Sequence, residues 1–311
     1  MSSHPTPPIL IEQTGPIVRL TLNNPERRNP LGRPVIAALS AALEAIAANT
    51  SVRVVVLAAA GQVFCSGHDL SHMVGRDEAE YRALFGECAA LMLQIRHLPQ
   101  PVIACVQGMA TAAGCQLVAT CDLAVAANTA RFAAPGLKIG LFCTTPMVPL
   151  MRAVPPKIAM ELLLTAEPIS ADRALAAGLL NRVVPLEQLE GAVAELAGQI
   201  ARASPQIVAL GKRAFYRQQS LDEATAYGEA VEIITANALQ PEAQEGIAAF
   251  LEKRSPRWST PELCRCLVSP SWPLRPADNR PGWVWPPPGG PTSPSCRRCL
   301  SPPGRVGSVP W

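Results

Sequence analysis

The stretch Gly108-Met-Ala-Thr-Ala-Ala-Gly-Cys-Gln-Leu-Val-Ala-Thr-Cys-Asp122 is the most informative part of this 311-residue chain. A β-branched apolar run, 101–107, precedes it and is typical of a buried strand. Small residues then open a short apolar helix, so a ligand can approach bare backbone N–H groups where the helix dipole favours negative charge. Such an arrangement can hold a developing oxyanion, and the stretch therefore predicts a site that polarises a carbonyl.

Outward from this stretch, predicted strands and helices alternate. Residues 9–13 and 16–22 predict a β-hairpin closed at Gly15-Pro16, followed by a helix over 33–48. The next predicted elements are a strand at 52–57, a helix at 78–98, a strand at 101–106, a helix at 112–119 and a strand at 122–127. This order, β-β-α and then β-α-β-α, predicts an α/β core.

Beyond about residue 146 the pattern is helical, with one short strand at 181–184. The predicted helices are 171–177 behind an N-cap at Ser170, 186–203, one that starts at Ser204-Pro205, 221–239 and 241–254. We expect a flexible N-terminus over 1–8, a core over 9–200 and a C-terminal helical module over 201–258. Such a module packs on the core or on a neighbouring subunit.

The composition changes abruptly after Trp258. Residues 259–311 hold 13 of the 32 prolines, four of the ten cysteines and four of the five tryptophans, and they show no periodicity. Because Pro-rich polar segments do not bury enough apolar surface to fold, we expect this segment to be disordered and foreign to the fold. Read-through in a shifted frame of a GC-rich gene would produce such an extension.

Charge and hydropathy exclude several classes of protein. The chain is 49% hydrophobic with a formal charge of +3, of which 259–311 carries +4 and 1–258 carries −1. The body therefore has no basic stripe for nucleic acid. No apolar run approaches the roughly 20 residues of a membrane span, and 1–8 lacks the features of a secretory signal. We expect a cytoplasmic protein that binds neither nucleic acid nor membrane.

The cysteines fall into two groups. Six lie mostly in apolar runs of the body and are expected to be buried free thiols: Cys65, Cys88, Cys105, Cys115, Cys121 and Cys143. The other four form Cys264-Arg-Cys266 and Cys296-Arg-Arg-Cys299, which loosely mimic zinc-ligand spacing. These two pairs are far apart and no histidine lies near, so we predict no metal site.

Two further segments complete the predicted site. Residues 63–70 follow a buried strand, and Gly67 permits a sharp turn that would aim the amide of His68 at a ligand. The amide of Ala113 would be the second donor, and a turn-rich segment, 131–141, would close the site. Two N–H groups from different loops form an oxyanion hole, in which removing one donor typically costs about 3–4 kcal/mol.

This set of segments resembles the crotonase superfamily, the enoyl-CoA hydratases and isomerases, and most closely its enoyl-CoA hydratase domain-containing branch. The resemblance runs from about residue 9 to Trp258 and includes 24–31, 166–180 and 245–258. It implies a ClpP/crotonase-like ββα spiral with a helical C-terminal trimerisation module. It also implies homotrimers, or hexamers built as dimers of trimers. The implied ligand is an acyl-CoA or enoyl-CoA thioester, with coenzyme A as part of the substrate and no separate cofactor.

The resemblance also implies roles for individual residues. The amides of His68 and Ala113 match the family's oxyanion hole, although many relatives have three glycines where this chain has Ala112-Ala113-Gly114. A backbone amide survives that change if the local φ is negative. The residues expected to contact the thioester or coenzyme A are Arg27, Arg28, Ser66, Gly67, His68, Asp69, Leu70, Gly114, Gly136, Phe250 and Lys253. Lys212 is a further candidate for a phosphate contact.

Two departures from the family pattern concern proton transfer. Hydratases place one Glu where this chain has Gln116 and a second where it has Gly136. Adding water across a double bond needs a base and an acid, which a carboxylate pair supplies. Because Gln116 cannot exchange a proton near neutral pH and Gly136 has no side chain, we expect hydration to be weak or replaced.

Several side chains and functions stay open at this level. The His68 side chain acts as a proton shuttle, or only the backbone amide of His68 takes part. His72 belongs to the site or only to the first turn of the helix that follows. Asp69 caps the following helix, whereas Cys143 and Thr144 line the pocket or fill the core. One candidate function is enolate chemistry with protons carried by His68, by a water on Gln116 or by the substrate. Another is thioester hydrolysis or decarboxylation, and a third is silent acyl-CoA binding.

Overall fold

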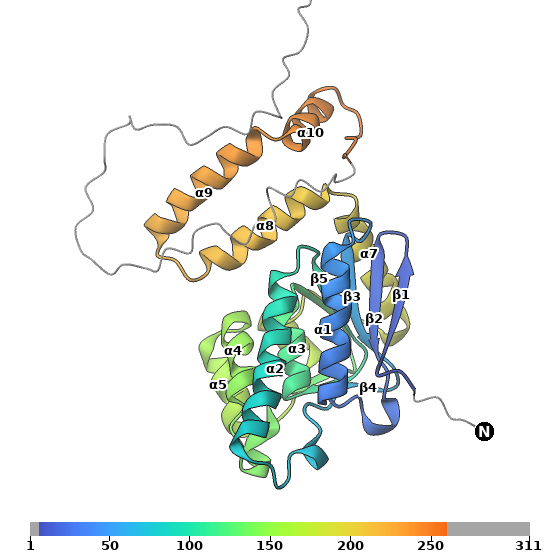
Figure 1. The fold of residues 1–311 in the computed structure, drawn as a ribbon, viewed down its shortest axis with the longest axis vertical. Coiled ribbons are helices and arrows are strands. Elements are labelled where there is room, and N and C mark those ends of the chain that lie inside the picture. The colour runs from blue at the N-terminus through green and yellow to red at the C-terminus, as the bar shows by residue number, and fades with distance from the viewer. Residues whose placement is uncertain (1–5, 260–311) are drawn as a thin grey trace, which may run out of the picture. The chain divides into compact units, whose positions relative to one another are not determined.

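The computed structural model describes residues 6–259, and its strands form two sheets (Figure 1). The six-stranded sheet has the order β1-β2-β3-β5-β7-β10, and the four-stranded sheet has the order β4-β6-β8-β9. The strands are β1 Ile9–Thr14, β2 Ile17–Leu22, β3 Val54–Ala59, β4 Val63–Cys65, β5 Val102–Val106, β6 Met109–Thr111, β7 Leu123–Ala127, β8 Arg131–Ala133, β9 Ile169–Ser170 and β10 Arg182–Val184.

The helices cover and extend these sheets. They are α1 Arg33–Ala48, α2 Glu78–His97, α3 Ala113–Thr120, α4 Thr144–Ala153, α5 Pro156–Thr165, α6 Ala171–Ala176, α7 Leu189–Ala201, α8 Pro205–Gln218, α9 Glu223–Ala238 and α10 Pro241–Leu251. Short 3-10 helices lie at Pro25–Arg27, Leu70–His72, Pro135–Ile139 and Leu186–Gln188. Among the described residues no helix is both long and apolar enough to span a membrane.

The chain winds as a spiral because successive strands alternate between the two sheets. β1 and β2 form the antiparallel hairpin, and β2, β3, β5, β7 and β10 then pair in parallel. Each of β3, β5 and β7 is followed by a short strand of the other sheet, namely β4, β6 and β8. This arrangement is the ββα spiral, and it confirms the predicted α/β class.

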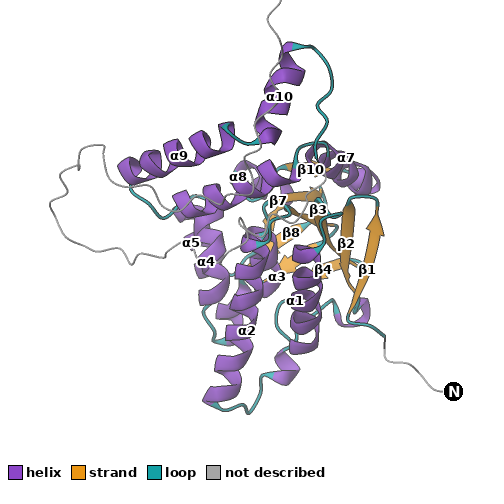
Figure 2. Cartoon of the chain, turned by 45° about the horizontal axis from the view of Figure 1, so that its top comes forward, coloured by secondary structure: helices purple, strands orange, loops and turns teal. Residues whose placement is uncertain are grey.

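Helix signals in the sequence account for α1 and α2. α1 has apolar residues at helical spacing, and Leu39, Leu43 and Ile46 on that face are buried. α2 starts at a capping box, in which the Asp77 side chain accepts from the Glu80 N–H and the Glu80 side chain accepts from the Asp77 N–H. Both helices pack on the same face of the six-stranded sheet as α3 (Figure 2).

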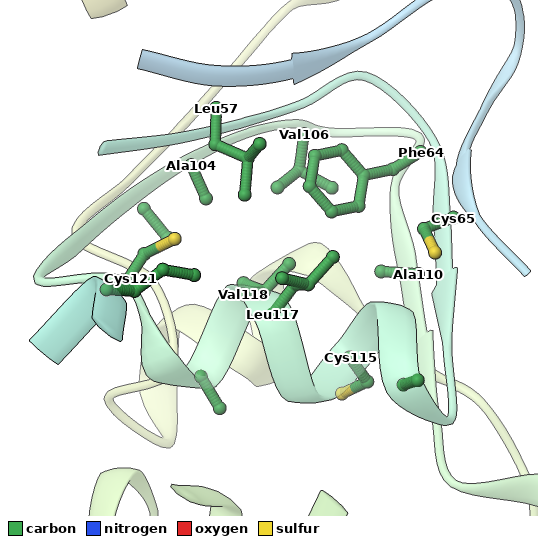
Figure 3. Packing of buried hydrophobic residues seen from close by; sticks show 14 of the residues in the cluster. Leu57, Phe64, Cys65, Ala104, Val106, Ala110, Cys115, Leu117, Val118 and Cys121 are labelled. Atoms are coloured by element: carbon green, nitrogen blue, oxygen red, sulfur yellow. The ribbon is translucent and has the colours of Figure 1, made fainter. Parts of the chain in front are cut away.

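The sheet has a core on each face because its central strands alternate. In β3, Val55 and Leu57 face the core formed with α1, α2 and α3, whereas Val54 and Val56 face α7. Figure 3 shows Leu117 and Val118 of α3 directed toward the strands that carry Leu57 and Val106. All of these side chains are buried. α3 is therefore packed on all sides.

The six cysteines of the body are buried free thiols, as predicted. They are distributed over β4, α2, β5, α3, the residue after α3 and the residue before α4. Burial raises the pKa of Cys65, Cys88, Cys105 and Cys115 to about 12, so these thiols are protonated at neutral pH. Residues 264–299, which hold the other four cysteines, lie outside the described residues.

A buried ion pair attaches α8 to the spiral. Lys212 of α8 donates to Asp122 Oδ2 at 2.7 Å, and Asp122 lies just beyond the end of α3. Lys212 also donates to the carbonyls of Ile95 and Gln100, each at 3.0 Å, and Tyr216 donates to Asp122 Oδ1 at 2.8 Å. α9 then packs along α8, and α10 contacts α9 near its end (Figure 1).

The structure differs from the prediction in three respects. The strand expected at 52–57 lies at Val54–Ala59, and the sequence predicted none of the strands of the second sheet, β4, β6, β8 and β9. Ser204 occupies the N-cap of α8, but its hydroxyl makes no capping hydrogen bond. This hydroxyl is buried and has no hydrogen-bond partner among the described residues. The division into 9–200 and 201–258 stays a prediction, and 1–5 and 260–311 lie outside the described residues.

Candidate functional site

Two loops meet where the sequence predicts the oxyanion hole. Gly67 has a φ of +89°, and a Cβ built on it would lie 2.9 Å from Ala112 Cβ and 3.4 Å from Ala113 N. The turn after β4 is thus in contact with the start of α3, and only glycine fits between them. The structure therefore places Gly67, the residue before His68, against the start of α3 and the backbone N of Ala113.

The orientation of the His68 amide follows from the carbonyl in the same peptide group. Gly67 O accepts from the Leu31 N–H at 2.7 Å, and the N–H of a trans peptide points opposite to its carbonyl. The His68 N–H therefore points away from Leu31. Within residues 6–259 neither this N–H nor that of Ala113 has a hydrogen-bond partner, which leaves both donors available to a ligand oxygen.

Ala112 holds an unusual backbone conformation just before the second donor. Its φ is +48° and its ψ is −116°, a region in which glycine is favoured over other residues. Hydrogen bonds on both sides hold it there, from Ala112 N to Ala133 O and from Gln116 N to Ala112 O, both 2.9 Å. The condition of a negative φ is not met at Ala112, and the strain falls on the residue before the donor Ala113.

Replacing Ala112 with glycine is expected to raise the free energy of unfolding by about 1 kcal/mol. The substitution removes backbone strain that typically costs about 1–3 kcal/mol, and the greater freedom of glycine in the unfolded chain offsets part of that gain. Urea unfolding at constant m-value measures the change. Ala119→Gly, in the regular part of α3, is the control and should lower the free energy of unfolding. If both variants lowered it equally, Ala112 would not be strained.

Gly114 fixes the position of the first turn of α3. A Cβ built there would lie 2.3 Å from Cys65 O and 2.8 Å from Cys65 Cβ, so α3 touches the backbone of β4 directly. No side chain fits in that space without moving one of the two elements. Gly114 therefore has a steric role at the site, whereas a direct contact with substrate stays a prediction.

The His68 side chain is folded into the protein. Its Nδ1 lies 3.0 Å from Leu31 O, and its ring meets the edge of Phe85 of α2 with a centroid separation of 5.5 Å. Burial lowers the pKa of His68 below its ordinary value of 6.5, despite the bond to the Leu31 carbonyl. Nε2 is buried and has no partner in the part of the chain that the structure describes.

Gln116 lies in the first turn of α3 and is only 3% exposed. Its Oε1 is buried without a hydrogen-bond partner among the described residues. An unpaired buried acceptor typically costs about 1–3 kcal/mol, so a donor from a ligand or water would stabilise it. Gln116, which the sequence analysis places where hydratases are expected to have a glutamate, is thus a buried hydrogen-bonding group that cannot titrate.

The space beside Gly136, where the sequence analysis expects the second hydratase glutamate, is filled by the loop that follows it. Gly136 is buried in the 3-10 helix Pro135–Ile139, and a Cβ there would lie 2.5 Å from Leu141 O and 2.8 Å from Cys143 Sγ. A side chain at residue 136 would therefore collide with both. Cys143 is buried behind Gly136, and Thr144 is exposed at the start of α4.

A cavity of about 510 Å³ lies beside the predicted coenzyme A segment 24–31. Arg27, Asp69 and His72 line it together with residues before β1 and around the start of α1. Arg27 bonds Asp69 and Ser71, and Asp69 accepts from the Ser71 N–H, which confirms its predicted capping role. The cavity thus presents a guanidinium held by a carboxylate.

The predicted residues Arg28, Ser66 and Leu70 lie in the same two chain segments as Arg27 and Asp69. Arg28 is exposed, has a φ of +63°, and its carbonyl accepts from the Ser66 N–H at 3.1 Å. Leu70 is half exposed. Asn29, which the sequence did not single out, donates to the carbonyls of Ala60 and Val63 and so fixes the loop to β4.

The remaining candidates lie elsewhere. The proposed phosphate contact of Lys212 is wrong, because its ammonium is buried and bonded to Asp122 and two carbonyls. Phe250 is 82% exposed on α10, and Lys253 follows that helix with a φ of +54°. α10 packs on α9. A contact of either residue with coenzyme A stays a prediction.

Comparison with known proteins identifies the family. The model of the enoyl-CoA hydratase/isomerase family matches residues 12–261. The chain belongs to the enoyl-CoA hydratase/isomerase family. Among solved structures, an enoyl-CoA hydratase from Mycobacterium smegmatis has a TM-score of 0.80 and 47% identity, covering 81% of this chain and 99% of its own. The predicted superfamily, crotonase fold and hydratase/isomerase-like enzyme class are therefore confirmed.

Two further relatives place the chain within the enoyl-CoA hydratase/isomerase family. Enoyl-CoA hydratase domain-containing protein 3 of Rattus norvegicus is 46% identical over 244 residues, which is 78% of this chain and 81% of the relative. The crystal structure of the human protein of that name has a TM-score of 0.79 and 44% identity, covering 81% of this chain and 100% of its own. The predicted branch is confirmed.

The expected cytoplasmic location is wrong for this branch. The rat, Xenopus laevis and human relatives are all named as mitochondrial proteins. The expectation rested on the composition of residues 1–8, which lacks a secretory signal but carries no information about other compartments.

Proposed function

We propose that the chain binds acyl-CoA thioesters and polarises the thioester carbonyl between the N–H groups of His68 and Ala113. The observation that supports this proposal is the approach of Gly67, the residue before His68, to Ala112 and Ala113, together with two backbone N–H groups that have no partner within residues 6–259. Donors fixed in this way stabilise a developing enolate oxygen without reorganising. The reaction is therefore one that passes through an enolate at Cα.

The coenzyme A part of the substrate fits the cavity beside residues 24–31. Arg27 lines it and Arg28 lies exposed in the same loop, so both guanidinium groups can reach phosphate oxygens. Asp69 bonds Arg27 and thereby positions it. Coenzyme A enters as part of the substrate, and the proposal needs no separate cofactor or metal.

Hydration in the usual manner does not suit this site. Gln116 cannot hold or release a proton, and Gly136 has no room for a side chain next to Leu141 and Cys143. We therefore propose weak or absent hydration of enoyl-CoA, with enolate chemistry retained. Thioester hydrolysis, decarboxylation and silent binding are the alternatives that the experiment below separates.

We propose a trimer, or a hexamer of two trimers, assembled through α8, α9 and α10. Large apolar side chains are exposed along these helices: Phe215, Tyr227, Val231, Ile234, Leu239, Ile247, Phe250 and Leu251. So much exposed apolar surface on successive helices favours an interface.

The names of the relatives support a mitochondrial site of action.

Binding and proton exchange together test the proposal. Calorimetry with butyryl-CoA is expected to show binding, and in D₂O the bound thioester should exchange its Cα protons because the enolate is stabilised. Hydration of crotonyl-CoA should be far slower than that exchange. A protein that binds no acyl-CoA would refute the proposal, and one that binds without exchange is a silent binder. Release of free coenzyme A would indicate hydrolysis.

A further inference from the structure

His72 lines the same cavity as Arg27, and Asp69 pairs with both. Asp69 Oδ2 lies 3.0 Å from Arg27 Nη1 and 3.5 Å from His72 Nδ1. The Asp69 side chain is largely buried, whereas those of Arg27 and His72 are more than half exposed. One carboxylate therefore holds two exposed nitrogen-bearing side chains at the wall of one cavity.

Hydrogen bonds fix the Asp69 carboxylate in this position. The Ser71 N–H and the Ser71 hydroxyl both donate to Oδ1, at 3.2 Å and 2.6 Å, and Arg27 Nη2 donates to the same oxygen at 3.1 Å. Burial raises the pKa of Asp69, but the Ser71 hydroxyl and the charges of His72 and Arg27 outweigh burial and leave this pKa below its ordinary value. Asp69 is therefore an anion at neutral pH.

The lining of the cavity is short of positive charge when His72 is neutral. Among the described residues that line it, Arg27 is the one permanently cationic side chain, against the carboxylates of Glu26 and Asp69. An anionic ligand is disfavoured in such a lining. A second proton on His72 makes the lining neutral and provides a charged donor beside Arg27, which phosphate oxygens accept readily.

The two ring nitrogens of His72 have different roles. Nδ1 faces Asp69, and a carboxylate only accepts hydrogen bonds, so the proton of the neutral ring is on Nδ1. Nε2 is then an acceptor, which becomes a donor for phosphate only with a second proton. Histidines gain this proton between about pH 5 and 8. Arg76 also lies near, because it donates to His72 O, but its own charge is paired with Glu80.

Resting on the function proposed above, we propose that His72 and Arg27 together bind a phosphate group of the coenzyme A thioester and that His72 takes up a proton as the phosphate binds. The imidazolium donates through Nε2, and the guanidinium donates through the N–H groups that do not bond Asp69. Asp69 is the positioning residue of the pair. Because the bound state holds one more proton than the free protein, affinity falls as the pH rises through the range in which the imidazole loses its proton.

Calorimetry of butyryl-CoA in PIPES and in imidazole buffer measures the protons taken up on binding. The phosphates of the thioester also exchange protons, so the informative quantity is the difference between wild type and His72→Gln. We expect the wild type to take up more protons near neutral pH, by at most about one per site. At pH 6 the variant should bind about fivefold more weakly, the upper range for an exposed charge pair, and at pH 8.5 equally well. The control His97→Gln, an exposed histidine at the end of α2, should behave like the wild type.

His72→Lys separates charge from structure. It carries a permanent charge, so it should keep tight binding at pH 8.5 and lose the extra proton uptake, a result that a merely structural role of His72 would not give. Butyryl-dephospho-CoA identifies the phosphate: a lost His72 effect assigns the 3′-phosphate, and an unchanged effect assigns the pyrophosphate. Equal proton uptake and equal pH dependence in wild type and His72→Gln would overturn the inference and leave the proposed function standing. Failure of the wild type to bind butyryl-CoA would refute the proposed function itself.

Discussion

Asp122→Ala is expected to lower the free energy of unfolding by about 3–5 kcal/mol. The side chains of Asp122 and Lys212 are only 14% and 7% exposed, so the substitution leaves the Lys212 ammonium buried without its counter-charge. It also removes the acceptor of the Tyr216 hydroxyl and of the Val102 N–H. Urea unfolding followed by circular dichroism measures the shift of the midpoint.

A surface pair provides the control for Asp122. Glu78 and Arg82 form an ion pair of similar length, 2.6 Å, but their side chains are 84% and 78% exposed. Exposed pairs typically contribute less than about 1 kcal/mol, so Glu78→Ala should have little effect. If Asp122→Ala were no more destabilising than Glu78→Ala, the ion pair would not be what attaches α8 to the spiral.

Gly136→Glu is expected to destabilise the protein and not to create a hydratase. A Cβ at residue 136 already lies 2.5 Å from Leu141 O, so the loop to Cys143 must move before a glutamate fits. Overpacking of this kind typically costs about 1–3 kcal/mol, occasionally more. Thermal unfolding measures the loss of stability. The rate of crotonyl-CoA hydration, with and without Gln116→Glu, shows whether hydratase activity is gained.

The control for Gly136→Glu is the same substitution where there is room. Gly191 is exposed in α7 and nothing lies within 4 Å of a Cβ built on it. Gly191→Glu should leave stability unchanged or raise it, because glutamate is the better helix former. A stable Gly136→Glu variant that hydrates enoyl-CoA at family rates would show that the loop yields easily and that the missing carboxylate alone limits hydration.

The elements that the sequence predicted well are those specified by neighbouring residues. The helix expected at 33–48 is α1 to the residue, because its apolar spacing is a local property. The Gly67 turn was predicted for the same reason, since a sharp turn before a ligand-facing amide needs a residue that tolerates positive φ.

Contacts between distant segments were not predictable in this way. The sequence suggested Lys212 as a phosphate ligand, yet it pairs with Asp122, 90 residues away, in the interior. Likewise nothing in the sequence links His68 to Phe85, or shows that Cys143 takes the space beside Gly136. Such pairs are set by how elements pack, and periodicity along one element does not record its partner.

Modification of the six buried thiols can report the local unfolding of the elements that carry them. Only the thiolate attacks a thiol-modifying reagent, so the protonated, buried cysteines of the body react only when their element separates from the core. Because they lie on β4, α2, β5, α3 and the segments that flank α3 and α4, their rates of modification would rank how readily each layer opens. A bound thioester should slow the modification of Cys65 in β4 and Cys115 in α3 most, because these cysteines lie nearest the proposed site.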